Sequence, residues 1–402
     1  MVQNWRLLAA LLSLPILSLT AGESTMESII PEASVKEIAY NSKFGPTDTM
    51  AEKKCYGRRK VPVTVVPEEE AINYQSGGIT PSVAPTIVNG SDTFITADFI
   101  WWKTFIDGME YAYTGVVDNG FAVPVGGSTK KGTAQNPNFG FKPGLKFGIG
   151  THFNHDGWDL LADWTYLYGN YRQNTTKVTA GSGRGMTSVQ SIVRTNGTTS
   201  TLDLSSAISR WKQEFNVIDL ELGRDFFLSR YLTMRPHMGF KTAWIHETSQ
   251  NTLTPVPGTE DVAPNLLNVA TLSNSEHMWG IGIRTGFDTG WHITKNWMFY
   301  GDLAFTNLWG KFTNTTKEVN SDSILGQVTT QNYTEHLSTV IPVIEAGLGI
   351  SYINWFAKNN YRFELRLGWE EQIWLNYNRS QDLVRVGDLT VQGLTLKTML
   401  NF

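Results

Sequence analysis

Hydrophobic and polar residues alternate along residues 143–171 in a way that predicts a two-stranded hairpin. In the first run, most of the odd-numbered residues from 145 to 153 are apolar, and the even-numbered residues between them are polar or glycine. After a short polar segment, 154–157, the alternation resumes at Trp158 and continues to Tyr168. A period of two is typical of β-strands with one apolar face. A short connection that ends in glycine favours antiparallel pairing of the two runs.

One register keeps both faces of this hairpin consistent, because a slip of one residue would exchange the faces of one strand. The hairpin admits two interpretations. In a soluble sandwich its apolar face would be core, whereas in a transmembrane barrel that face would meet lipid and end in aromatic residues. The expected pairs are Phe153–Trp158, Phe147–Trp164, His152–Asp159 and Lys146–Thr165.

Two-faced segments of this kind recur from residue 94 to residue 402. Short connections alternate with long ones that are rich in Thr, Asn, Ser and Gly, such as 174–209, 249–275 and 313–335. This sorting of connections is typical of an up-and-down barrel of the bacterial outer membrane, so it favours the membrane interpretation. The predicted strands are 94–103, 109–116, 139–153, 158–171, 210–223, 231–247, 276–289, 297–311, 337–353, 361–376 and 388–402.

The number of these segments is odd, whereas bacterial single-chain barrels normally have an even number of strands. We place the missing strand before residue 94, within 61–88, and a hairpin inside a long loop would also serve. The predicted fold class is therefore all-β: a transmembrane up-and-down antiparallel β-barrel of about 12 strands, with a range of roughly 10 to 16.

Charged residues of the predicted strands gather on the face opposite the apolar one, which would line a wet lumen. Three cross-strand pairs are expected there: Glu221 with Arg235, Asp219 with His237, and Arg284 with Asp302. Both signs are present, which predicts weak ion selectivity at most; the alternative is that these side chains only solvate and pair inside the barrel. The predicted pore-lining residues are Lys146, His152, Asp159, Asp163, Asp219, Glu221, Arg235, His237, Lys241, Arg284, Asp288, Asp302, Glu345, Arg362, Glu364, Arg366, Glu370 and Lys397.

Glycines interrupt the same face, for example Gly148, Gly150, Gly280 and Gly282. Glycine inside a strand can mark a close approach by another backbone. We therefore expect a folded-in loop or the N-terminal segment to pack against these glycines and narrow the pore.

The N-terminal part of the chain differs in amino-acid composition from the rest. Residues 1–22 carry a basic residue, a short apolar run and small residues, which predicts a secretory signal peptide. Residues 23–92 are charged and Pro-rich and are interpreted as a periplasmic or lumenal segment, followed by the barrel over 93–402. Cys55 is the only cysteine, so the chain forms no internal disulfide; a free thiol and an intermolecular disulfide both remain open.

Composition narrows the function classes. The chain is 41% hydrophobic and 17% charged, with 20 Phe, 14 Trp and 37 Gly among 402 residues, which fits a barrel whose outer face meets lipid. A net charge of -4 with no basic stripe argues against a nucleic-acid partner. No G-x-S-x-G, H-E-x-x-H, phosphate-loop or paired-cysteine motif occurs, and no two of the seven histidines have helical ligand spacing. We therefore expect no enzyme activity, cofactor or metal, although a Ser-His-Asn site assembled across strands stays open.

Four stretches carry a resemblance to a known family: 97–102, 107–112, 143–150 and 155–160. With them, the chain resembles the major-outer-membrane-protein-like porins of Legionella and of environmental chlamydia-like bacteria, over roughly residues 94–402. The resemblance implies an outer-membrane porin or surface antigen and admits a homotrimer. Members of the chlamydial group often carry several cysteines that cross-link the envelope, and this chain departs from them in having one.

The expected function is that of a porin of the bacterial outer membrane, through which small hydrophilic solutes and ions diffuse passively in a water-filled lumen. Its expected partners are outer-membrane lipid, the solutes, and the outer-membrane assembly machinery. The last of these follows from Phe402, because an alternating final strand with a terminal phenylalanine resembles the C-terminal signature of bacterial outer-membrane proteins. The alternative is a structural surface antigen or adhesin with a blocked lumen.

Overall fold

The computed structural model describes residue 87 and residues 92–117, 133–153, 157–176, 184–189, 192–193, 199–200, 204–256, 267–322, 326–378 and 387–402. The predicted signal peptide 1–22, nearly all of the predicted segment 23–92, and Cys55 lie outside these residues. In the part of the chain that is described, no helix has the length and hydropathy needed to cross a membrane.

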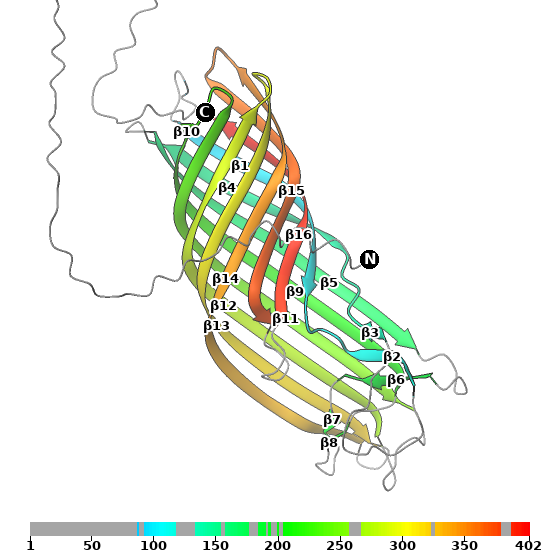
Figure 1. The fold of residues 1–402 in the computed structure, drawn as a ribbon. Helices are drawn as coiled ribbons and strands as arrows, with labels where there is room; N and C mark the ends of the chain where they lie inside the picture. The colour runs from blue at the N-terminus through cyan, green and yellow to red at the C-terminus, as the bar shows by residue number, and fades with distance from the viewer. Residues whose placement is uncertain are drawn as a thin grey trace, which may run out of the picture. The chain divides into compact units, whose positions relative to one another are not determined.

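Ten long strands form a closed antiparallel barrel (Figure 1). The first of them, β1, pairs with the last, β16, so the wall has no open edge around its circumference. The prediction of an all-β, up-and-down antiparallel barrel is confirmed, and the strand number lies at the lower end of the predicted range. The wall strands are β1 (Thr93–Ile106), β4 (Phe141–His152), β5 (Trp158–Thr176), β9 (Leu204–Arg224), β11 (Leu232–Pro255), β12 (Leu267–His292), β13 (Trp297–Asp322), β14 (Gly326–Phe356), β15 (Tyr361–Asn378) and β16 (Gly387–Asn401).

One predicted wall strand, 109–116, belongs elsewhere. Its strand, β2 (Ala112–Val117), pairs with β3 (Thr133–Gln135) and β6 (Arg184–Ser188) in a separate three-stranded sheet. Without it the predicted set has an even number of strands, so the additional strand sought within 61–88 is not needed to close the wall. The remaining short strands are β7 (Ile192–Val193), β8 (Thr199–Ser200) and β10 (Phe226–Phe227), and β10 pairs with β11 outside the wall.

Two of the predicted long loops are largely strand. β11 and β12 stay paired as far as Leu253 and Ala270, and β13 and β14 stay paired as far as Asp322 and Gly326. These segments are rich in Thr, a β-branched residue that favours strands, although their polarity suggested loops. As a result the wall rises further along β9 to β14 than along β15, β16, β1 and β4 (Figure 1).

The β4–β5 hairpin has the predicted register. Phe147 pairs with Trp164, Lys146 with Thr165, and His152 with Asp159, while the Phe153 amide donates to the Trp158 carbonyl oxygen at 2.6 Å. The short turn and the two distinct faces explain this agreement, because only one pairing satisfies both.

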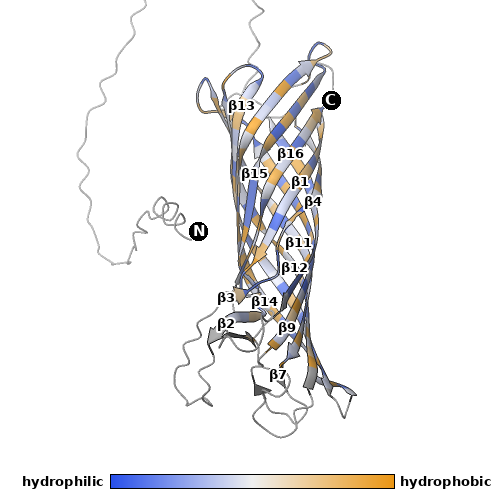
Figure 2. Ribbon diagram, turned by 90° about the vertical axis from the view of Figure 1, so that its right-hand side faces the viewer, coloured by the Kyte–Doolittle hydropathy of each residue, from blue (hydrophilic) through white to orange (hydrophobic). Residues whose placement is uncertain are grey.

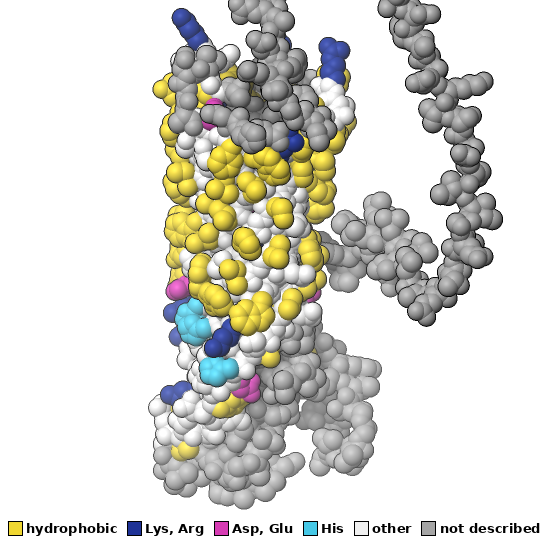
Figure 3. Space-filling view, turned by 90° about the vertical axis from the view of Figure 1, so that its left-hand side faces the viewer, with side chains coloured by type: hydrophobic (Ala, Val, Ile, Leu, Met, Phe, Trp, Pro, Cys, Tyr) yellow, Lys and Arg dark blue, Asp and Glu magenta, His cyan; other side chains and the backbone are white. Residues whose placement is uncertain are grey.

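The outer face of the wall carries a broad apolar band (Figure 3). Hydrophobic and hydrophilic residues alternate along the strands (Figure 2). The middle of the band is aliphatic and phenylalanine-rich, and Phe147 and Ile149 are about half exposed. Aromatic side chains gather at both ends of the band, such as Trp291 and Trp297 near the short turns and Trp244 and Trp279 nearer the long connections. Aromatic girdles on either side of an apolar band are typical of barrels that cross an outer membrane.

Candidate functional site

The interior of the barrel divides into two halves along its axis. In the half nearer the short turns, a cavity of about 790 Å³ is bounded by many charged side chains together with apolar ones. Asp225, Arg230 and Lys295 from the short turns are among its lining, so the cavity extends to that mouth of the barrel. We take this cavity as the candidate functional site.

Sixteen of the eighteen predicted pore-lining residues border the cavity. The other two lie beside it: Lys241 is fully buried against Asp219, and Glu364 is fully buried between two arginines. That solutes pass these residues stays a prediction. The sixteen are Lys146, His152, Asp159, Asp163, Asp219, Glu221, Arg235, His237, Arg284, Asp288, Asp302, Glu345, Arg362, Arg366, Glu370 and Lys397.

The inward position of these residues follows from strand alternation, since every second side chain of a barrel strand points inside. The exact neighbours differ from those expected. Glu221 lies opposite Gly239, Asp219 opposite Lys241, and Arg284 opposite Thr306. The three expected cross-strand pairings are therefore wrong in register, although every residue involved faces inward as expected.

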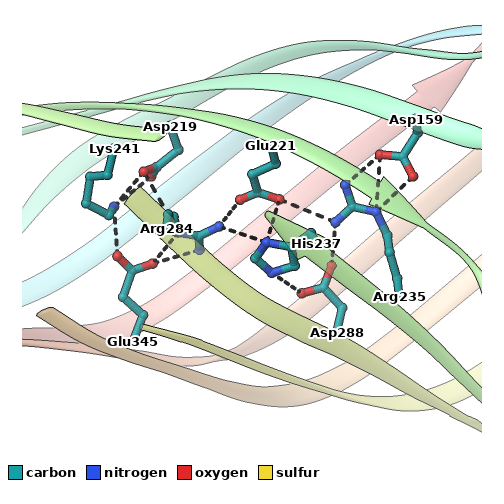
Figure 4. A network of polar contacts seen from close by, with 9 residues as sticks. All are labelled: Asp159, Asp219, Glu221, Arg235, His237, Lys241, Arg284, Asp288 and Glu345. Atoms are coloured by element: carbon teal, nitrogen blue, oxygen red, sulfur yellow. Dashed lines mark hydrogen bonds and ion pairs between the residues drawn. The ribbon is translucent and has the colours of Figure 1, made fainter. Parts of the chain in front are cut away.

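Arg235 on β11 is the centre of one part of the charged network (Figure 4). Its guanidinium donates to Asp159 through Nη2 at 2.5 Å and through Nε at 2.9 Å, which is the bidentate geometry that holds a carboxylate most firmly. Nη1 reaches Asp288 at 2.8 Å and Glu221 at 3.3 Å. Arg235 therefore contacts Glu221 as expected. The two residues are not opposite each other in the β9–β11 register, and the long arginine side chain spans the offset.

Arg284 on β12 extends the same network toward the middle of the barrel (Figure 4). It contacts Glu221 and donates through Nη2 to Glu345 at 2.8 Å. Lys241 lies between Asp219 and Glu345, at 2.7 Å from each. These contacts join strands that are not neighbours in the wall, such as β12 and β14, so the network braces the barrel from inside.

A second charged group lies on the opposite arc of the wall. Lys146 on β4 pairs with Glu370 on β15, and the two strands β1 and β16 lie between them in the wall. The Lys146 ammonium lies 4.7 Å from the centre of the Trp102 ring. Glu364 accepts from Arg362 and Arg366 at 2.5 Å each. Removing Lys146, Glu370 or Glu364 would leave an opposite charge inside the wall without this partner.

In the other half of the lumen the inner face carries a large apolar cluster. Buried polar side chains lie beside it, such as Gln213, whose amide donates to Glu247 at 2.9 Å. Side chains from nine wall strands form one buried cluster, whose large aromatic members pack edge to face: Phe215 against Trp374, and Phe312 against Tyr377, each at 5.6 Å between ring centres. We call this cluster the apolar seal. The seal consists of Ile100, Trp102, Ile106, Met109, Leu167, Tyr171, Trp211, Phe215, Val217, Ala243, Ile245, Met278, Leu308, Phe312, Ile341, Val343, Trp374, Tyr377, Leu389 and Val391.

A charged interior is therefore found in one half of the lumen, whereas in the other half large apolar side chains predominate and polar ones such as Gln213 and Glu247 accompany them. Glycines of the inner face lie close to neighbouring strands. A side chain at Gly150 would meet the ring of Phe94, and one at Gly280 would meet Leu308. A side chain at Gly282 would meet the backbone of Asn307 on the neighbouring strand. The N-terminal segment and parts of the long connections lie outside the described residues, so their packing against these glycines stays a prediction.

Asp225 lies at the mouth of the cavity, between β9 and β10 and outside the wall strands. Burial raises the pKa of its carboxyl to about 6, the nearby carboxylates of Asp159 and Asp288 raise it further, and Arg235 lowers it. This mouth therefore has a group that changes charge in mildly acidic conditions.

The charged cavity holds no arrangement of nucleophile, base and oriented partner that would indicate catalysis, among the residues described. In the same part of the chain, no group of three or more His, Cys, Asp or Glu side chains is already arranged to hold a metal ion. What the cavity does offer is open space with carboxylates and guanidinium groups around it.

Comparison with solved structures finds proteins of low sequence identity to this chain. Escherichia coli outer membrane protease OmpT is 11% identical, with a TM-score of 0.40, and the match covers 78% of this chain and 98% of OmpT. A Pseudomonas aeruginosa FadL homologue is 8% identical, with a TM-score of 0.23, over 81% of this chain and 95% of the other. The P. putida toluene transporter TodX is 8% identical, with a TM-score of 0.20, over 81% and 92%. Similarities this low carry no functional argument.

No curated protein matches the chain. A family model does: the model described as Legionella pneumophila major outer membrane protein precursor matches residues 86–402, which includes the whole barrel. The chain is therefore a β-barrel protein of the bacterial outer membrane and belongs to the Legionella major outer membrane protein family.

Proposed function

We propose that this chain is an outer-membrane barrel with a closed lumen that acts at the cell surface, as a structural surface protein or adhesin. The observation that supports this function is the apolar seal. Trp211, Phe215 and Trp374 are fully buried on the inner face, where a solute would have to pass. Exposing one such aromatic side chain to water costs about 4–6 kcal/mol from its area alone. Because several would have to move together, passive diffusion through this half would be slow.

The extension of strands β11 to β14 beyond the apolar band supports the same proposal. Beyond the apolar band, β11 to β14 continue as paired strands with Thr, Ser and Asn on their faces. Paired strands form a more rigid surface than loops, and a rigid polar surface beyond the membrane suits contact with other molecules. The function would then lie in this extension, with the barrel as its anchor.

The charged cavity favours a second candidate, the porin. A cavity of about 790 Å³ reaching the short-turn mouth has room for hydrated ions or a small polar solute. Passage would require the seal to rearrange. The two candidates therefore differ in one measurable property, the conductance of the folded barrel.

The test is single-channel recording after the purified protein is inserted into a planar bilayer, with a heat-modifiability gel to show that the barrel has folded. A closed lumen predicts a flat trace at moderate voltage. Sustained stepwise currents from the folded protein would overturn the closed-lumen proposal and favour the porin. A liposome-swelling assay with small sugars provides an independent reading of the same difference.

A further inference from the structure

We propose that His246 and His277, together with Glu214, form a binding site for a divalent transition-metal ion such as Zn²⁺, Ni²⁺ or Cu²⁺ on the outer face of the barrel. The site lies beyond the apolar band, away from the charged cavity and the seal. The proposal does not depend on whether the lumen conducts.

The two imidazoles already lie side by side. His246 on β11 and His277 on β12 are directly paired positions, and their rings are nearly parallel at 17°, with centres 3.8 Å apart. A tetrahedral ion with Zn–N bonds of about 2.0–2.1 Å needs two ligand nitrogens roughly 3.3 Å apart. A small splay of the rings would provide that separation without any movement of the backbone.

A carboxylate flanks the pair on the next strand. Glu214 on β9 lies directly opposite His246, so three potential ligands occupy one row across three neighbouring strands. Directly opposite side chains have Cβ atoms about 4.5–5.5 Å apart, a distance that glutamate can span. Two imidazoles and a carboxylate are a ligand set suited to Zn²⁺ and its neighbours. The described residues hold no ready-made group of three ligands, so Glu214 would turn toward the pair when the ion binds.

The surroundings give the ion both access and support. A groove of about 410 Å³ on this face is bounded by Glu214, His246 and His277, with Trp244 and Trp279 on its membrane side. Figure 3 shows histidine side chains at the edge of the hydrophobic band, where water reaches the surface. Nε2 of His246 lies 3.3 Å from the hydroxyl of Ser275, a contact that helps to orient the ring.

Packing alone is the competing explanation, because two neutral imidazoles can stack as aromatic rings do. Packing requires no ion and makes no use of Glu214. If the site binds a metal ion, substitution of any of the three residues should weaken the affinity for that ion. A metal titration of the variants therefore distinguishes metal binding from packing.

The experiment is isothermal titration of the full, untagged protein in detergent with ZnCl2, followed by Co²⁺ absorption in the visible range as a report on the ligands. We expect one tight Zn²⁺ equivalent per chain. The variants His246→Asn and His277→Asn should each weaken the affinity by about tenfold or more, and Glu214→Gln should weaken it by a smaller factor. All three side chains point outward, and a heat-modifiability gel verifies that each variant has folded.

The matched control is His292→Asn, near the short-turn end of β12, which should leave the Zn²⁺ affinity unchanged. The proposal is overturned if the wild-type protein shows no Zn²⁺ binding at about 100 μM. It is equally overturned if the variant that lacks both His246 and His277 binds Zn²⁺ as the wild type does.

Discussion

The two halves of the lumen are built on the same strands and fill the same width by opposite means. On β9, the inward residues include Trp211, Gln213 and Phe215 in one half and Asp219 and Glu221 in the other. The first half is filled mainly by packed apolar side chains, and the second surrounds a cavity with paired charges. One strand can therefore supply a seal and a charged cavity in succession, with no plug domain needed between them.

The two halves also differ in why the barrel loses stability when a side chain is removed. In the seal, truncation leaves a cavity and costs the lost packing. In the charged half, truncation of one partner leaves another charge buried without compensation. This contrast organises the expected effects of substitution.

The largest effect is expected from opening the seal with Trp211→Ala and Trp374→Ala together. Each fully buried tryptophan should contribute about 3–5 kcal/mol to the free energy of unfolding, and their joint loss should create a water path and channel openings in a planar bilayer. The control is Trp101→Ala on the lipid-facing side, where the side chain is 51% exposed, which should produce no current. A folded double variant with no current would show that another part of the lumen is the barrier.

The next effect concerns the charged half. Lys241→Met removes the cation shared by Asp219 and Glu345, and we expect a loss of about 3 kcal/mol in unfolding free energy, measured by urea titration in lipid vesicles. Lys295→Met, at an exposed turn position, should change stability by less than about 0.5 kcal/mol. Equal effects of the two substitutions would contradict the role assigned to the buried pair.

The smallest effect is expected at the mouth of the cavity and depends on pH. The pKa of Asp225 is raised to about 6 in the folded protein, so the native state holds a proton more tightly than the unfolded chain does. The resulting stabilisation is complete below about pH 4 and is lost as the pH rises through 6. Asp225→Asn should remove this dependence and gain about 2 kcal/mol or less at pH 7. Unfolding midpoints at pH 4, 5, 6 and 7 test this, and parallel pH profiles for the two proteins would contradict it.

Sequence reasoning succeeded where pairing is local. The β4–β5 register was predictable because a short turn joins two strands with unlike faces. It failed for Glu221, Asp219 and Arg284, although their strands are also joined by short connections, such as 293–296 between β12 and β13. A shift by two or four residues keeps every side chain on its own face, so the alternation that identifies the lumen cannot select among such registers.

The apolar seal and the His246–His277 pair were not predicted from the alternation of hydrophobic and polar residues. Phe99, Ile100, Trp101 and Trp102 are apolar on both faces of one strand, which indicates a buried inner face there, yet the charged residues of other strands suggested a wet lumen throughout. His246 and His277 are brought together only by pairing of β11 with β12. Their separation along the chain resembles no ligand spacing, so no motif search could join them.

The pairing of β1 with β16 closes the barrel and limits when this last pair of strands can form during folding. The Thr398 hydroxyl donates to the Ala97 carbonyl oxygen at 2.6 Å, although these residues are 301 positions apart. Joining ends this distant costs about 5 kcal/mol of chain entropy, compared with about 2 kcal/mol for a ten-residue loop. The seam must therefore form last, after the final strand has been synthesised and exported. Until then the edges of β1 and β16 offer unpaired backbone groups, with which another strand could pair.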